Sequence, residues 1–107
     1  TSVTMTGEFW GPRMAERHGI RVLVPDDTGM RELDRIIYTE LAAGRFTDGD
    51  RASCLREIGR LTAAGAEAIV LGCTELQLLV RPADTPALLF DTLELHARAA
   101  AEHALAD

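Results

Sequence analysis

The most informative stretch of this 107-residue sequence is Ala68-Ile69-Val70-Leu71-Gly72-Cys73-Thr74-Glu75-Leu76, in which an apolar run passes directly into a polar turn. A short apolar run bounded by turn residues is typical of a buried strand. The pattern predicts a strand over 68–71, a turn at Gly72-Cys73-Thr74 and a short helix over 75–80. It therefore places Cys73 at the carboxyl end of a buried strand and close to the start of a helix.

Two further apolar runs have the character of buried strands: Ile20–Val24, which Pro25 ends, and Ala87–Phe90. Helical patterns with N-cap and glycine stop signals separate these runs. The helices are expected to span Glu8–His18 behind an N-cap at Thr6, Asp26 to Gly44, Asp48 or Asp50 to Gly65, and Asp91 or Thr92 to about Ala106.

The alternation of helices with continuous apolar runs is typical of α/β proteins, whose parallel sheets are covered on both faces. The sequence thus predicts one α/β domain over 1–107, with three layers and a parallel sheet of about four short strands flanked by helices. Three of these strands lie in the chain. Because the chain opens at Thr1 without an initiator Met, we expect it to be a fragment whose fourth strand lies just upstream.

The charge pattern argues against several classes of protein. The formal net charge is −6 and the eleven Lys and Arg residues are scattered, whereas a nucleic-acid surface needs a basic patch. No apolar segment approaches the length of a membrane span, and no signal peptide is recognised. Cys54 and Cys73 do not resemble a disulfide framework, so we expect a cytoplasmic protein with free thiols.

Cys73 is the residue best placed for chemistry. In open α/β sheets, ligands bind outside the carboxyl ends of the strands, and a helix N-terminus lowers a thiol pKa. Thr74 can donate a hydrogen bond to a carboxylate. The structural alternative is that Cys73 only packs, as buried cysteines commonly do, and that Glu75 is a solvated carboxylate in the first turn of a helix.

The segment Ile69–Leu79, IVLGCTELQLL, resembles the second cysteine signature of the aspartate/glutamate racemase superfamily. Other segments resemble the aspartate racemase branch in the same order along the chain: Thr4-Met5, then Arg35–Leu41 with Gly44-Arg45, then Phe90-Asp91-Thr92 with Leu95-His96-Ala97. The resemblance covers nearly the whole chain. It implies that the chain is the C-terminal half of a two-domain racemase.

The resemblance also implies a chemistry without pyridoxal phosphate or metal, in which two cysteines face each other across the substrate Cα. Cys73 corresponds to the second cysteine, Thr74 to a substrate-contacting position, and Glu75 to an orienting residue of the aspartate-type branch. The first cysteine belongs to the absent N-terminal half. Cys54 is no substitute, because its helical spacing from Ile58 places it on or beside the apolar face. The isolated chain is therefore expected to be inactive.

Two further residues are candidates for holding the substrate carboxylate: Thr4, before the first expected helix, and Arg45, after a glycine stop. Simple capping for Thr4 and a solvated cation for Arg45 are the alternatives. No Cys/His/Asp set has metal-site spacing and no nucleotide motif is present, so no cofactor is expected. The implied partners are an amino-acid substrate, the N-terminal half and possibly a second copy.

A different class of function also fits the sequence. The chain could be a non-catalytic α/β module, a truncated relative that binds a small carboxylic acid or a partner chain, because fold alone does not fix function.

Overall fold

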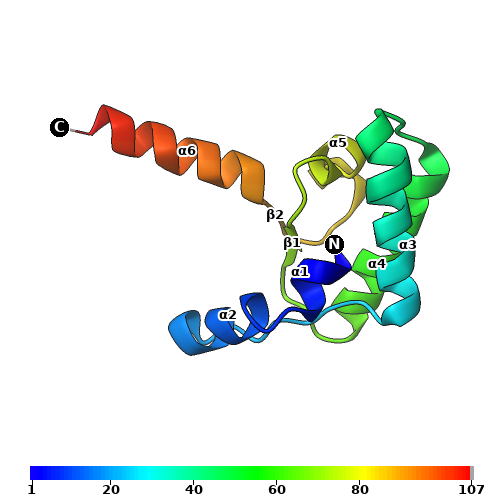
Figure 1. Ribbon diagram of the computed structural model, residues 1–107, viewed down its shortest axis with the longest axis horizontal. Coiled ribbons are helices and arrows are strands. Elements are labelled where there is room, and N and C mark those ends of the chain that lie inside the picture. Colours follow the sequence, from blue (N-terminus) through cyan, green and yellow to red (C-terminus); the bar gives the residue numbers. More distant parts are fainter. Residues whose placement is uncertain (107) are drawn as a thin grey trace.

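Two short strands form the centre of the computed structural model, which describes residues 1–106 (Figure 1). Strand β1 (Ile69–Leu71) pairs in parallel with β2 (Leu89–Asp91), in a register that places Ile69 opposite Leu89 and Leu71 opposite Asp91. A helical crossover joins the strands, as parallel pairing requires. The prediction of an α/β chain with a parallel sheet is confirmed.

Helices account for most of the remaining chain, and their order follows the predicted one. The α-helices are α1 (Ser2–Thr6), α2 (Trp10–His18), α3 (Asp27–Arg35), α4 (Asp48–Ala63), α5 (Leu76–Leu79) and α6 (Thr92–Leu105). The π-helical turn η1 (Ile36–Glu40) and the 3-10 turn η2 (Leu41–Ala43) extend α3, and the 3-10 turn η3 (Pro82–Asp84) follows α5.

The helix ends follow local chemistry. Asp26 accepts a hydrogen bond from the Gly29 amide (2.8 Å), and Thr47 accepts one from the Asp50 amide (3.1 Å), so both act as N-caps. Gly44 ends the helix after η2 in the left-handed conformation, with φ of 72°. The prediction for the first helix is wrong at its start. Thr6 is the last residue of α1, and Gly7 after it is extended, so Thr6 does not cap α2, which begins at Trp10.

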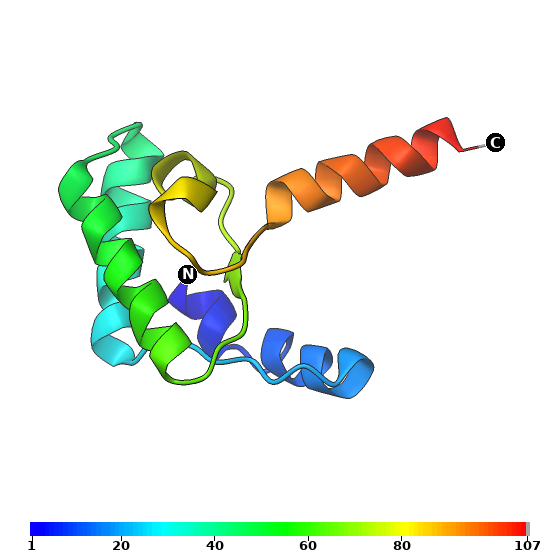
Figure 2. The ribbon, with the colours of Figure 1, turned by 180° about the vertical axis from the view of Figure 1, so that it is seen from behind.

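The core lies between the sheet and the α3–α4 pair, which stand side by side in both views (Figures 1 and 2). Cys54 is 4% exposed in this core, so the prediction that it lies on or beside the apolar face of its helix is confirmed. Helix α5 adds its last residues to the same cluster. The buried apolar side chains are Ile36, Ile37, Leu41, Cys54, Ile58, Ile69, Leu71, Leu79 and Val80.

The strand predicted over Ile20–Val24 is wrong. The segment contains no strand residue and pairs with no strand among residues 1–106, and the side chains of Ile20 and Val24 are exposed. Its β-branched residues favour extended backbone, but a strand also needs a neighbour with which to form a ladder. The described sheet consequently has two strands, where the sequence predicted three within the chain and a fourth upstream.

The prediction of helices on both faces of the sheet is also wrong for residues 1–106. Ile69 and Leu71 point into the core, whereas Val70 and Phe90, which lie opposite each other, point to the other face and are 45% and 41% exposed. Helices α2 and α6 extend away from the α3–α4 pair and contain no buried residue (Figures 1 and 2). One face of the sheet is thus covered and the other is open.

Candidate functional site

Cys73 lies in the turn between β1 and α5, two residues after the last strand residue. Its side chain is half-buried and packs against the core cluster. The thiol donates a hydrogen bond to Oε2 of Glu75, at an Sγ–Oε2 distance of 2.9 Å. The backbone carbonyl of Cys73 accepts a bond from the Leu76 amide (3.2 Å), which closes the turn. The predicted position at the carboxyl end of a strand is confirmed.

The environment of Cys73 favours the protonated thiol. Burial raises the pKa of Cys73, and the hydrogen bond to the Glu75 carboxylate raises it further. The same hydrogen bond, together with the Thr74 hydroxyl, lowers the pKa of Glu75. The expectation that a helix N-terminus lowers the thiol pKa is wrong, because α5 begins at Leu76 and has only four residues. At neutral pH the Cys73 side chain is therefore held as a thiol.

Two hydrogen bonds hold the Cys73 turn from its two ends. Upstream, Oγ1 of Thr92 donates to the carbonyl of Leu71 (2.9 Å). Downstream, Nε of Arg51 donates to the carbonyl of Leu79 (2.8 Å), which ties the end of α5 to α4. Neither contact was predicted from the sequence. The sequence indicated Asp91 and Thr92 as a helix start and as part of the family resemblance, but the contact of Thr92 with Leu71 depends on the register of the sheet.

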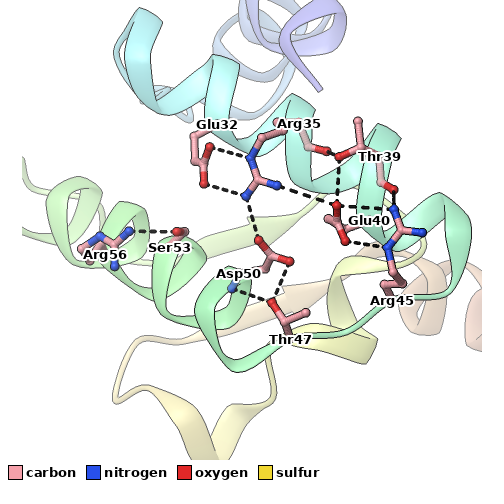
Figure 3. Close-up of polar contacts among 9 residues, drawn as sticks. All are labelled: Glu32, Arg35, Thr39, Glu40, Arg45, Thr47, Asp50, Ser53 and Arg56. Carbon is pink, nitrogen blue, oxygen red and sulfur yellow. Dashed lines mark hydrogen bonds and ion pairs between the residues drawn. The ribbon is translucent and has the colours of Figure 1, made fainter.

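Arg45 belongs to a separate polar network on α3, η1 and α4 (Figure 3). Its Nε donates to Oε2 of Glu40 (2.8 Å) and its Nη2 to the carbonyl of Thr39 (2.6 Å), and the guanidinium lowers the pKa of Glu40. In the same network Arg35 bridges Glu32 and Asp50, which fastens α3 to α4. The guanidinium of Arg45 is thus hydrogen-bonded within its own chain. Its role in binding a substrate stays a prediction.

Thr4 lies within α1 rather than before the first helix, as the sequence had suggested, and its side chain is exposed. Among residues 1–106, no hydrogen bond joins Thr4 or Arg45 to Cys73, Thr74 or Glu75. The structure therefore groups the three consecutive residues of the turn and leaves the other two candidates apart from them. The substrate-binding role of Thr4 stays a prediction.

An open pocket of about 260 Å³ lies at the carboxyl ends of β1 and β2, where ligands of parallel sheets bind. Leu71, Leu89 and Phe90 are among the residues that line it, and Asp91 and Glu94 give it an acidic side. Gln77 also lines the pocket, and its Oε1 is buried without a hydrogen-bond partner in the described chain. The pocket adjoins the strand that leads into the Cys73 turn.

Within residues 1–106, no three His, Cys, Asp or Glu side chains are grouped so as to hold a metal ion. No helix there combines the length and the apolar character needed to cross a membrane. Burial raises the pKa of Cys54 to about 11, so this second thiol is an inert core residue.

Glu75→Gln should lower the pKa of Cys73, because the amide removes the negative charge that opposes ionisation of the thiol. The rate of alkylation of Cys73 by iodoacetamide, measured against pH, reports this pKa directly. Glu67→Gln is the control, since this carboxylate is not in the Cys73 turn. An unchanged or raised pKa in Glu75→Gln would show that the Sγ–Oε2 contact does not govern the thiol.

Comparison with known proteins finds a matching family model and similar solved structures. The family model for Asp/Glu/Hydantoin racemase matches residues 3–100. A proposed Asp/Glu racemase from Yersinia pestis is 43% identical, with a TM-score of 0.91 over 99% of this chain and 46% of that chain. An aspartate racemase homologue from Pyrococcus horikoshii OT3, PH1733, is 36% identical, with a TM-score of 0.86 over 97% of this chain and 45% of that one. The chain spans about half the length of both proteins.

Proposed function

Since the chain belongs to the Asp/Glu/Hydantoin racemase family, we propose that it supplies the second catalytic cysteine, Cys73, to a pyridoxal-phosphate-independent amino-acid racemase. The observation that carries this proposal is the Cys73–Glu75 hydrogen bond at the carboxyl end of β1. This hydrogen bond orients a half-buried thiol, and the thiol carries the proton that would be delivered. We assign the chain to the C-terminal half of the aspartate-type branch, on the Gly72-Cys73-Thr74-Glu75 sequence.

Racemisation removes the α-proton from one face of the amino acid and returns a proton to the opposite face. It needs one acid and one base on two sides of the Cα, each with a pKa suited to the operating pH. Cys73, held as a thiol beside Glu75, fits the donor for one direction of the reaction. In the other direction its thiolate accepts the α-proton, and the thiol that results again donates to the Glu75 carboxylate. Thr74, exposed beside it, is the proposed contact for the substrate carboxylate.

The opposing base must come from elsewhere, because Cys54 is buried in the core with a raised pKa. We assign it to the half that this chain lacks relative to its longer relatives. The open sheet face fits this assignment, because exposed Val70 and Phe90 would be covered by a second domain. Helix α6 also exposes Leu93 and Leu95, and it extends away from the α3–α4 pair (Figure 2).

The remaining assignments follow from the same proposal. Thr4 and Arg45 are further candidates for binding the substrate carboxylate. To do so, Arg45 would have to release its hydrogen bond to Glu40. Two free thiols suit a reducing cytoplasm. A homodimer of the two-domain protein is compatible with the exposed apolar side chains of Phe9, just before α2, and of Leu93, Leu95 and Leu105 on α6.

The test is interconversion of the enantiomers of aspartate and glutamate, followed by chiral chromatography without added pyridoxal phosphate. A protein containing both halves should racemise at least one of them, and the isolated chain should racemise neither. Turnover by the isolated chain would contradict the assignment of the second base to the other half. Binding of a dicarboxylic acid without turnover by the longer protein would favour a non-catalytic module instead.

A further inference from the structure

We propose that Thr92 is a positioning residue for Cys73: its hydroxyl holds the end of β1 and thereby fixes where the thiol lies relative to Glu75. The inference rests on the proposed function for its importance, but its geometry stands on this chain alone. Oγ1 of Thr92 donates to the carbonyl of Leu71 at 2.9 Å, two residues before Cys73.

The register of the sheet explains why Thr92 is able to make this contact. Leu71 lies opposite Asp91, and the Ile69 amide donates to the carbonyl of Leu88, the residue before its partner. Since this pattern recurs at every second residue of a parallel ladder, the carbonyl of Leu71 faces the residue that follows Asp91. Thr92 occupies that position, but it is also the first residue of α6. Its hydroxyl therefore reaches the carbonyl of Leu71 at the point where the chain turns away from the sheet.

The capped first turn of α6 holds the backbone of Thr92. The Asp91 carboxylate accepts hydrogen bonds from the amides of Leu93 (2.9 Å) and Glu94 (3.2 Å), so the first turn of α6 is firmly capped. Helix α6 follows β2 directly along the chain and then extends away from the rest of the described residues (Figure 1). The Thr92 hydroxyl is thus the side-chain link between the start of α6 and the strand that leads into the Cys73 turn.

Gly72 explains why the hydrogen bond from Thr92 matters for the position of the Cys73 thiol. Gly72 separates Leu71 from Cys73, and a Cβ built on it would meet no heavy atom within 4 Å. Glycine has the widest backbone freedom of any residue, so local sterics do not fix the direction of the chain there. Proton transfer needs its groups held within about half an ångström, and a fixed Leu71 carbonyl narrows the positions that Cys73 can take.

The experiment measures alkylation of the two cysteines of the 107-residue chain by iodoacetamide at pH 7, resolved by mass spectrometry of the tryptic peptides. Thr92→Val keeps the shape of the side chain and removes the donor. Burial and the hydrogen bond to Glu75 both raise the pKa of Cys73. Because the thiol of the variant loses its fixed contact with Glu75, a larger share is thiolate, and Cys73 should be alkylated about threefold faster or more.

Thr92→Ser retains the hydroxyl and should react at the rate of the unsubstituted chain. Thr62→Val is the matched control, because the Thr62 hydroxyl bonds only within α4, to the carbonyl of Ile58 (2.9 Å). Cys54 reports on the fold, since it is buried and should stay unreactive in every variant.

Three results would overturn the proposal: an unchanged or slower rate for Cys73 in Thr92→Val, an equal acceleration in Thr92→Ser, or acceleration of Cys54 together with Cys73 in Thr92→Val. The last result would show that Thr92 supports the whole fold rather than the turn. None of these outcomes depends on racemase activity, so a failure of the proposed function and a failure of this inference are seen in different assays.

Discussion

Cys73→Ser, introduced into a protein that contains both halves, should lower the kcat of racemisation by about 10³-fold, within the range that a positioned acid or base contributes. The serine hydroxyl is far less acidic than the thiol, so it cannot exchange a proton with the substrate Cα at neutral pH. The substitution changes one atom, and Glu75 keeps a hydrogen-bond donor opposite it. Circular dichroism of the amino acid follows the loss of optical activity over time.

Cys54→Ala is the control for that experiment, because Cys54 lies in the core and outside the Cys73 turn. It should retain most of the activity of the unsubstituted protein. An equal loss in both variants would mean that the assay reports stability, and full activity in Cys73→Ser would remove Cys73 from the mechanism.

Leu79→Ala should lower the free energy of unfolding by about 3 kcal/mol, the loss typical of a leucine truncated in a packed core. Leu79 is 0% exposed and closes α5 onto the core cluster. Its carbonyl also accepts the bond from Arg51, so the residue anchors the whole Cys73 turn. Urea denaturation of the isolated chain, followed by far-ultraviolet circular dichroism, measures the change.

Leu78→Ala provides a matched control in the same short helix. Leu78 is 53% exposed, so its truncation should change the free energy of unfolding by less than about 0.5 kcal/mol. Equal losses in the two variants would contradict the position of α5, because they would place both leucines in the same environment.

Local chemistry made much of the fold predictable. The run from Ala68 to Leu71 followed by Gly72 indicated a strand and a turn, and the structure has both. Asp26 and Gly44 marked the two ends of one helical stretch, because capping depends only on neighbouring residues. The spacing of Cys54 from Ile58 likewise placed it in the core.

The failures concern features that depend on distant parts of the chain. Ile20–Val24 has the composition of a strand, but strand formation requires a partner that residues 1–106 do not supply. The bond from Thr92 to Leu71 depends on the register between β1 and β2. The pKa of Cys73 was misjudged because burial against the core, to which distant residues contribute, raises it, and the hydrogen bond to Glu75 raises it further.

The most direct test of Cys73 as one of two opposed acid–base groups is exchange of the substrate α-proton with deuterium. It is followed by proton NMR in deuterated water, with each enantiomer incubated separately and a Cys73→Ala variant of the two-domain protein. The remaining base acts on one face of the substrate only. The expected result is exchange of a single enantiomer, without racemisation. Unchanged exchange of both enantiomers would contradict the placement of Cys73 opposite a second base.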